Sequence, residues 1–294
     1  MKLNSMTRFT GACHLALVTA GALHLGTAMA GDRLIGTAGV SQIEGAGGGG
    51  LTPWALITGY GTRDQIGASA FTTRLRTRGG FTLTAAGLAV GIQNRVEFSL
   101  ATQRFGLSDT VPGETIGLDI VGAKVRLFGD AVYDQDSLLP QVALGVQWKR
   151  NNDFDRVPKL LGASSANGMD FYLSATKVWL AGLAGRNPFL NVTVRNSSAN
   201  QFGLLGFGGP NGDSRRLHPE LSAGLFVADS VALGVEYRAK SNNLTSFKEE
   251  AAKDVFAAWF LNKNLSLTAA YVDLGNIADK PKQTGWYVSA QLAL

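Results

Sequence analysis

The sequence predicts an all-β protein, an antiparallel transmembrane β-barrel of the outer membrane with about 12 strands. Segments of about ten residues alternate strictly between apolar and polar side chains, which is the pattern of strands with one lipid-facing and one inward face. The connections between these segments alternate between tight turns and long polar loops, as they do at the two ends of a membrane barrel.

Residues 1–30 are predicted to be a signal peptide. Lys2 and Arg8 form its positive start, 15–25 is a short apolar core, and the small-residue motif AMA ends at Ala30. We therefore expect export and cleavage after Ala30. An uncleaved signal anchor is the alternative, and the shortness of the apolar run argues against it.

The composition of the exported chain excludes several classes of protein. Cys13 is the only cysteine and lies in the leader, so disulfides and thiol chemistry are excluded. Without Lys2 and Arg8 the formal net charge falls from +5 to +3, which is too small to indicate a nucleic-acid partner. No later segment has the roughly 18 consecutive apolar residues of a membrane helix. A soluble periplasmic β-protein remains the alternative to a barrel.

The first exported segment, 31–53, does not alternate. It contains the run GAGGGG at 45–50, the most flexible stretch of the chain. We expect either a flexible tail or linker, or a plug that folds into the mouth or lumen of the barrel. The transmembrane barrel itself is predicted over 54–294.

The clearest strands form the hairpin 220–240, whose arms ELSAGLFV and VALGVEYR alternate strictly around a turn at Asp229. Twelve strands result if 54–76 is one long strand, which is the preferred count. If 54–61 and 66–76 are separate strands, 33–43 joins them and the count becomes about 14. The predicted strands are 54–76, 81–91, 96–105, 116–128, 139–149, 170–180, 189–196, 220–227, 231–240, 254–261, 265–272 and 285–294.

All five tryptophans lie at or near predicted strand ends. Amphipathic rings favour the level of the lipid headgroups, so these residues are predicted to mark the two membrane interfaces. Ordinary core positions are the alternative. The residues are Trp54, Trp148, Trp179, Trp259 and Trp286.

Charged side chains on the polar faces are predicted to line the lumen. Each would cost about 2–4 kcal/mol if it faced lipid at the membrane midplane. Seven of these side chains are basic and four are acidic, which favours an aqueous pore with mild anion preference. A salt-bridged interior that fills a narrow barrel is the alternative. The predicted lining is Arg95, Glu97, Lys124, Arg126, Gln147, Lys149, Arg195, Glu220, Glu236, Arg238, Lys240 and Asp254, with Gln103, Gln141 and Asn191 beside them.

Five runs of the sequence resemble a known family. They are GGGGLTPWALITGYGTRDQIG (47–67), RLFGDAVYDQD (126–136), NQFGLLGFGG (200–209), EYRAK (236–240) and LTAAYVDLGNIA (267–278). The chain resembles the Gram-negative outer-membrane family known as domain of unknown function 3034 (DUF3034). The resemblance implies a barrel and an outer-membrane location, and it implies no substrate, catalytic residue or cofactor.

The last strand bears on assembly. Its outward stripe ends in Leu294, whereas barrel-assembly signals commonly end in an aromatic residue. We therefore expect the barrel-assembly machinery to be a partner during biogenesis, with a weaker recognition signal.

A passive channel for small polar or anionic solutes is the leading functional hypothesis, with 31–50 and 199–218 as candidate constrictions. A closed barrel with a structural or interaction role is the first alternative. An outer-membrane lipid hydrolase is the second, in which His218 would act with the nearby Ser214 and Glu220. No nucleophile motif surrounds His218, so no catalytic residue is predicted.

Metal and cofactor sites are not predicted. Asp134 and Asp136 are too few carboxylates for a calcium loop, and the glycine runs lack the strand-to-helix context of a phosphate loop. Outer-membrane lipid and lipopolysaccharide are the expected partners. Basic loop residues could meet lipopolysaccharide phosphates, although solvated loop charges are the simpler interpretation. These residues are Arg215, Arg216, Lys248 and Lys253.

Overall fold

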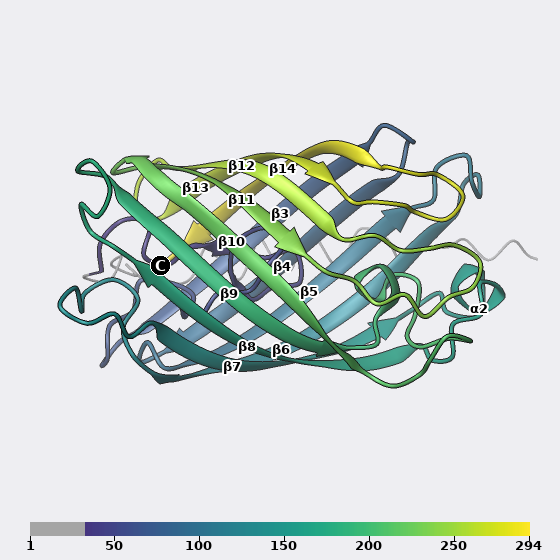
Figure 1. Cartoon of the computed structure of the whole chain (residues 1–294), viewed down its shortest axis with the longest axis horizontal. Coiled ribbons are helices and arrows are strands. Elements are labelled where there is room, and N and C mark those ends of the chain that lie inside the picture. Colours follow the sequence, from purple (N-terminus) through teal and green to yellow (C-terminus); the bar gives the residue numbers. More distant parts are fainter. Residues whose placement is uncertain (1–32) are drawn as a thin grey trace, which may run out of the picture.

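A computed structural model describes residues 33–294. Twelve strands form one closed barrel in which every neighbouring pair is antiparallel, and β14 pairs with β3 to close it (Figure 1). The strands are β3 (Ile66–Thr77), β4 (Thr82–Ile92), β5 (Val96–Gly106), β6 (Thr115–Phe128), β7 (Gln141–Asn151), β8 (Asn167–Val178), β9 (Asn187–Ser197), β10 (Arg216–Ala228), β11 (Val231–Arg238), β12 (Ala252–Phe260), β13 (Leu265–Asp273) and β14 (Thr284–Ala293). The signal peptide predicted over 1–30 lies outside the described residues.

Four short elements lie outside the barrel wall. β1 (Val40–Ser41) and β2 (Gly47–Gly48) form a separate antiparallel pair. α2 (Val157–Leu160) lies in the connection between β7 and β8, and η1 (Asn200–Gly203) lies in the connection between β9 and β10. No helix in residues 33–294 is long and apolar enough to cross a membrane.

The two ends of the barrel differ. We call the end that carries Leu294 the terminus end and the opposite end, which carries α2, the loop end (Figure 1). The connections at the loop end are 78–81, 107–114, 152–166, 198–215, 239–251 and 274–283, and those at the terminus end are 93–95, 129–140, 179–186, 229–230 and 261–264. Most long connections therefore lie at one end, as in membrane barrels.

Three connections depart from that sorting, and one of them makes hydrogen bonds to other parts of the structure. The connection 129–140 is long although it lies at the terminus end. Its Tyr133 hydroxyl accepts a hydrogen bond from the backbone N–H of Leu34, and three of its carbonyls accept hydrogen bonds from the ammonium of Lys177. The other exceptions are 179–186, which is as long as 107–114 although it lies at the terminus end, and 78–81, which is a tight turn at the loop end.

The outer face of the wall is apolar along the middle of the strands. Leu100, Val121 and Val255 are 50%, 46% and 63% exposed, and they alternate with buried inward neighbours. Because only lipid can accommodate such a continuous apolar belt around a closed barrel, the fold is a transmembrane β-barrel of the outer-membrane type.

The predicted count of twelve strands is confirmed, and the alternative of 14 is wrong. Residues 54–65 do not extend β3, and 33–43 contributes only the short β1. Instead, the chain before Ile66 leaves the wall and folds within the barrel. Pro53 and several glycines in 45–61 favour turns over a continuous ladder.

Leu100→Arg tests the membrane face. Leu100 lies at the middle of β5 and points outward, so a charge there should lower the free energy of unfolding in lipid vesicles by about 2–4 kcal/mol. Leu217→Arg, near the loop end of β10, is the matched control and should cost about 0–1 kcal/mol. Equal losses at both positions, measured by urea unfolding, would contradict the assigned membrane depth.

Candidate functional site: a plugged lumen

The lumen is occupied by residues 33–61, which we call the plug. The plug enters at the terminus end, turns within the barrel and returns to the same end to begin β3 (Figure 1, purple). Every residue from 36 to 61 is buried. Its exit is held at the barrel rim, where the backbone N–H of Tyr60 donates to the carbonyl of Leu294. The sequence left two alternatives for 31–53, a flexible tail or linker and a plug. The described part of this segment lies in the lumen.

Glycine lets the plug backbone approach the wall closely. A Cβ on Gly49 would lie 2.0 Å from Oε1 of Glu236 on β11. A Cβ on Gly48 would lie 2.5 Å from the backbone nitrogen of Trp54, where the plug folds back on itself. The glycine run is therefore a tightly packed part of the structure, because only residues without a side chain fit between the plug and the wall.

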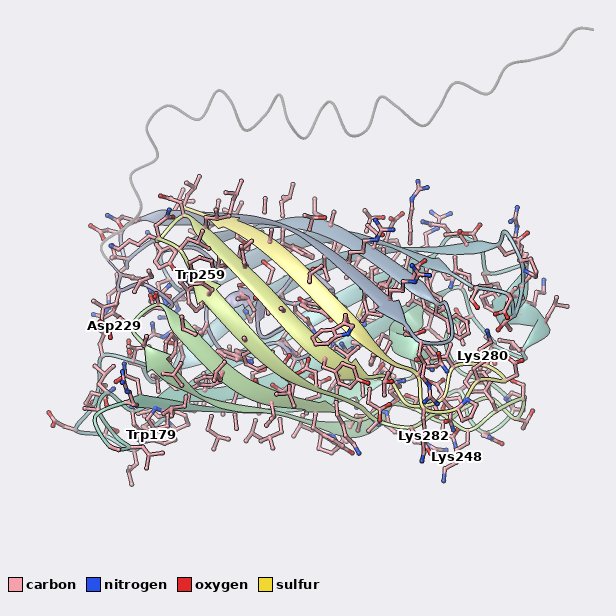
Figure 2. All side chains as sticks on the ribbon, turned by 90° about the horizontal axis from the view of Figure 1, so that it is seen from above. Trp179, Asp229, Lys248, Trp259, Lys280 and Lys282 are labelled. Carbon is pink, nitrogen blue, oxygen red and sulfur yellow. The ribbon has the colours of Figure 1, made fainter. Side chains whose placement is uncertain are left out.

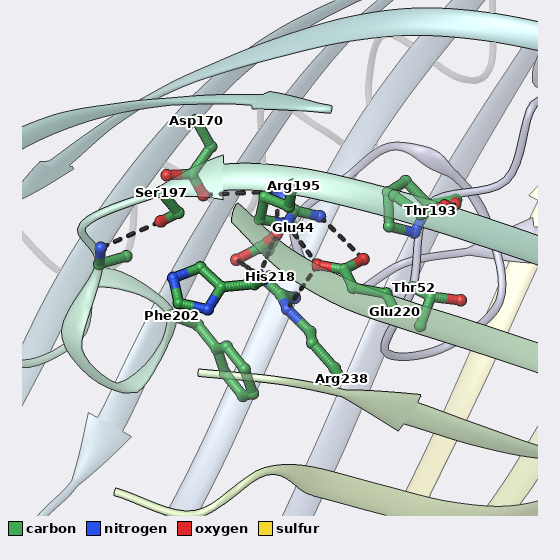
Figure 3. A network of polar contacts seen from close by, with 12 residues as sticks. Glu44, Thr52, Asp170, Thr193, Arg195, Ser197, Phe202, His218, Glu220 and Arg238 are labelled. Atoms are coloured by element: carbon green, nitrogen blue, oxygen red, sulfur yellow. Dashed lines mark hydrogen bonds and ion pairs between the residues drawn. The ribbon is translucent and has the colours of Figure 1, made fainter. Parts of the chain in front are cut away.

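Glu44 is the only charged residue between Leu34 and Gly61, and its carboxylate is fully buried. It lies 2.9 Å from Nη2 of Arg238, with Nη1 of Arg195 at 3.6 Å (Figure 3). Nζ of Lys149 lies 2.5 Å from the same carboxylate. Burial alone would raise the pKa of Glu44, but these three cations outweigh it and hold the pKa well below its usual range. Glu44 is therefore a buried anion held by the wall.

Two wall carboxylates complete this cluster, which we call the Glu44 cluster. Asp170 lies 2.7 Å from Nζ of Lys149 and 3.4 Å from Arg195. Glu220 lies 2.5 Å from Nε of Arg195 and 3.3 Å from Nε of Arg238. Three cations therefore face three carboxylates, one of which belongs to the plug. Buried charges require this pairing, since an unpaired one carries its full desolvation cost. The cluster comprises Glu44, Lys149, Asp170, Arg195, Glu220 and Arg238.

A second ion pair of the wall binds the plug backbone. Glu97 and Lys124 lie 3.1 Å apart on β5 and β6. Glu97 accepts hydrogen bonds from the N–H groups of Gly47 (3.0 Å) and Thr58 (2.8 Å). Lys124 donates to the carbonyls of Gly47 (2.8 Å) and Trp54 (3.2 Å). The pair thus provides hydrogen-bond partners for backbone groups of the plug at Gly47, Trp54 and Thr58.

Glu236 on β11 is a third anchor. It accepts hydrogen bonds from the N–H of Leu51 (2.7 Å) and the hydroxyl of Thr52 (2.8 Å). Asp254 lies opposite it in the register of β11 and β12. The plug is therefore bound by wall groups from β5 round to β11, and most of these contacts are polar.

The loop end is closed by the connection 198–215, whose residues 199–209 are buried. The Phe202 carbonyl accepts from Lys149 at 3.3 Å, and its ring lies 4.1 Å from the Arg238 guanidinium. Glu249, in the next long connection, accepts from the N–H of Gln201 at 2.8 Å. Burial raises the pKa of Glu249 to about 7, although the nearby Lys240 ammonium opposes this. This connection therefore meets the Glu44 cluster from the side opposite the plug.

The structure places most of the predicted lining inside the barrel. Arg126 and Lys240 lie at its two ends, where Arg126 binds Asp130 and Lys240 binds Gln201. Gln103, Gln141 and Asn191 donate to carbonyls of the plug. The other inward residues, all buried, are Glu97, Lys124, Gln147, Lys149, Arg195, Glu220, Glu236, Arg238 and Asp254.

The prediction for Arg95 is wrong. Arg95 is exposed at the tight turn between β4 and β5, one residue before the strand begins. The side chain of a turn residue does not follow the alternation of the neighbouring strand, so parity does not place Arg95 on the inward face.

The sequence reasoning missed two charged residues, Glu44 and Asp170. Asp170 shares its strand parity with the buried Tyr172 and Ser174, so alternation along β8 would have found it. Glu44 could have been noticed as a lone carboxylate in a glycine-rich apolar segment.

With Asp170 added and Arg95 removed, the buried and half-buried inward side chains of the strands include as many acidic as basic residues, so the strands do not show the predicted basic excess. The acidic residues are Glu97, Asp170, Glu220, Glu236 and Asp254, and the basic ones are Lys124, Arg126, Lys149, Arg195 and Arg238.

Four of the five tryptophans lie outside the lumen, near the barrel ends. Trp148 and Trp286, 40% and 66% exposed, lie toward the loop end. Trp259, 52% exposed, and Trp179 lie at the terminus end (Figure 2). The prediction for Trp54 is wrong, because this residue belongs to the plug. Its ring is buried 5.1 Å from that of Phe189 inside the barrel.

His218 does not bind the partners that the hydrolase hypothesis named. Its Nε2 lies 3.0 Å from Oγ of the buried Ser241, not beside Ser214. The carboxylate of Glu220, the acid of such a triad, is bound by Arg195 and Arg238. This geometry gives the hydrolase hypothesis no support.

These features define a closed twelve-strand membrane barrel with a plugged, polar lumen. The chain belongs to the family described as Protein of unknown function (DUF3034), whose model matches residues 37–291 and so covers most of the plug as well as the barrel. No curated protein sequence matches the chain.

Solved barrels of similar fold share little sequence with this chain. The KdgM porin is 11% identical with a TM-score of 0.50, over 76% of this chain and 98% of that one. The NanC porin is 11% identical with a TM-score of 0.49, over 76% of this chain and 100% of that one. The Acinetobacter baumannii outer membrane protein Omp33 is 8% identical with a TM-score of 0.44, over 80% and 100% of the two chains. At this identity the similarity establishes the fold only.

Glu44→Gln tests the anchoring of the plug. Removing one partner of a buried charge network costs about 3–5 kcal/mol, because the remaining cations lose their counterion. We expect the plug to undock more often, so that a cysteine placed by Ala46→Cys reacts with a polar maleimide at least roughly a hundredfold faster.

Glu114→Gln is the matched control, since Glu114 forms an exposed ion pair with Arg156 at 2.6 Å and should leave the labelling rate unchanged. Equal rates in the Glu44→Gln and Glu114→Gln proteins would show that the cluster does not hold the plug.

Proposed function

We propose that this protein is an outer-membrane channel for small polar solutes, held closed by the plug and opened when the plug leaves the wall. The observation that carries the proposal is the polarity of the inner wall where the plug covers it. Gln103, Lys124, Asn191 and Glu236 all bind the plug through hydrogen bonds. A barrel that needed only a filled interior would gain more from apolar packing than from these buried polar groups.

Release of the plug would expose a wall that water can solvate. Each anchoring contact is a hydrogen bond or ion pair for which water is a replacement partner. Without Glu44, the cluster keeps three cations and two carboxylates, while Glu236 and Asp254 face each other nearer the terminus end. We therefore propose at most a weak preference for anions, because both basic and acidic side chains line the path.

The name of the KdgM porin, a barrel of similar fold, agrees with this proposal. If the barrel is instead permanently closed and structural, no current is expected even after the plug is removed.

Removing the plug tests the channel proposal. The full protein in a planar bilayer should give rare, brief openings. A variant that lacks residues 37–57, which retains the rim contact of Tyr60, should give steady ohmic current with a small reversal potential in a salt gradient. A second variant that also replaces 200–207 by a short Gly-Ser linker removes the loop-end closure.

Current from either variant, when the parent is closed, supports the proposal. Silence from both, in protein shown to be folded by its heat-modified mobility on gels, would establish the closed structural barrel instead. Equal steady current from the parent would show that the plug does not close the pore.

We also propose the location and orientation: export with cleavage after Ala30, insertion by the barrel-assembly machinery, and the loop end facing outward. The outer face near the loop end carries exposed basic residues with no hydrogen bond or ion pair to another described residue. Arg74 and Arg104 flank Thr84 in one row across β3, β4 and β5. These side chains suit lipopolysaccharide phosphates. The residues are Arg74, Arg76, Arg104 and Arg150.

Arg74→Gln combined with Arg104→Gln tests this partner. Each basic side chain near an anionic lipid surface contributes about 1 kcal/mol, so lipopolysaccharide binding should weaken roughly tenfold or more in a titration. Arg63→Gln with Arg186→Gln makes the same charge change at the terminus end and should leave binding unchanged. Equal weakening in both pairs would indicate a general charge effect.

A further inference from the structure

A cavity of about 250 Å³ lies within the terminus end, between the plug and the wall formed by β8 to β12. Its chemistry is opposite to that of the rest of the lumen. On β9 to β12 the inward positions near this end carry aromatic and small residues, whereas farther along the same strands they carry Arg195, Glu220, Arg238 and Asp254. The wall contributes Phe189, Phe226, Ala232, Phe256, Ala258 and Phe260.

Five aromatic rings form a continuous lining. The ring of Trp54, from the plug, lies 5.1 Å from that of Phe189. The Phe189 ring lies 6.0 Å from Phe226 and 6.4 Å from Phe256, and the Phe226 ring lies 6.1 Å from Phe260. These separations are those of favourable aromatic pairs, so the rings support one another around the cavity.

The space is built into the wall and does not depend on a flexible side chain. The Phe189 ring lies over Gly224 of β10, where a Cβ would be 2.3 Å from it, and the Phe256 ring lies over Gly234 of β11, where a Cβ would be 2.6 Å away. Two strand glycines thus let two rings lie against the wall and leave the centre open. Ala232 and Ala258 extend the open region because their side chains are short.

The cavity reaches the terminus end beside Leu34, Leu180 and Asp229, each of which is exposed. Figure 2 shows Asp229 at this end of the barrel. A ligand can therefore enter without displacement of the plug. The polar lining consists of Asn187 and Thr37 with the carboxylate of Asp229 at the rim, so the interior offers no counter-charge to an ion.

We propose that this cavity binds a small uncharged aromatic molecule of one or two rings. An apolar cavity of about 150 Å³ is enough to hold benzene, so the larger volume here suits one or two fused rings. Ring-lined walls favour such a guest through offset and edge-to-face contacts as well as through burial. The site is distinct from the polar path of the proposed channel, and a non-conducting barrel would leave this proposal intact.

Quenching of Trp54 fluorescence tests the proposal. In a variant with Trp148, Trp179, Trp259 and Trp286 replaced by phenylalanine, only the cavity tryptophan emits. Titration of this protein in detergent with 1-bromonaphthalene, a heavy-atom quencher, should give saturable quenching. A variant that retains only the outward Trp259 reports partition of the quencher into detergent and should show a linear response.

Matched alanine variants then locate the site. Ala258→Phe fills the cavity and should raise the apparent dissociation constant at least tenfold, and Ala232→Leu should do the same from the neighbouring strand. Ala257→Phe adds the same ring to the lipid face of β12 and should leave the titration unchanged. Linear quenching of Trp54, no quenching, or saturable quenching that survives both filling variants would overturn the proposal.

Discussion

Each charge on the inner wall must find its partner inside the lumen, because the other face of every strand contacts lipid. Neighbouring strands share partners: Arg195 on β9 and Arg238 on β11 both bind Glu220 on β10, which lies between them. The wall residues of the Glu44 cluster are three cations and two carboxylates. Glu44 of the plug supplies the third carboxylate. Charge balance therefore couples a segment near the start of the chain to strands far along it.

The lumen contains two environments. Polar side chains bind plug backbone on the side of β5 and β6 and bind the inward-folded connection at Phe202 toward the loop end. On the side of β9 to β12, at the terminus end, rings that lie against strand glycines line an apolar cavity. A polar wall is compatible with water if the plug leaves, whereas an apolar cavity is compatible with an uncharged guest while the plug stays. The two proposals thus rest on different residues and on opposite physical chemistry.

Alternation with a period of two predicted the wall well, and it failed where the chain leaves the wall. Lys149, Arg195 and Glu236 point inward as their parity requires. Arg95 lies on a turn and Trp54 in the plug, and neither position is governed by strand parity. Glu44 was not predicted as a lumen residue, because no local pattern indicates that a carboxylate in a glycine-rich segment will contact three cations.

The sequence was enough to predict the barrel, its number of strands and the face that most strand residues take, since pleating and lipid exposure act on neighbouring residues. What fills the barrel depends on contacts between distant parts of the chain. The contacts of Glu44 with Arg238 and of Trp54 with Phe189 join residues more than a hundred positions apart. Barrel closure brings these residues together. The spacing of residues along the chain does not predict which inward side chains then share a partner.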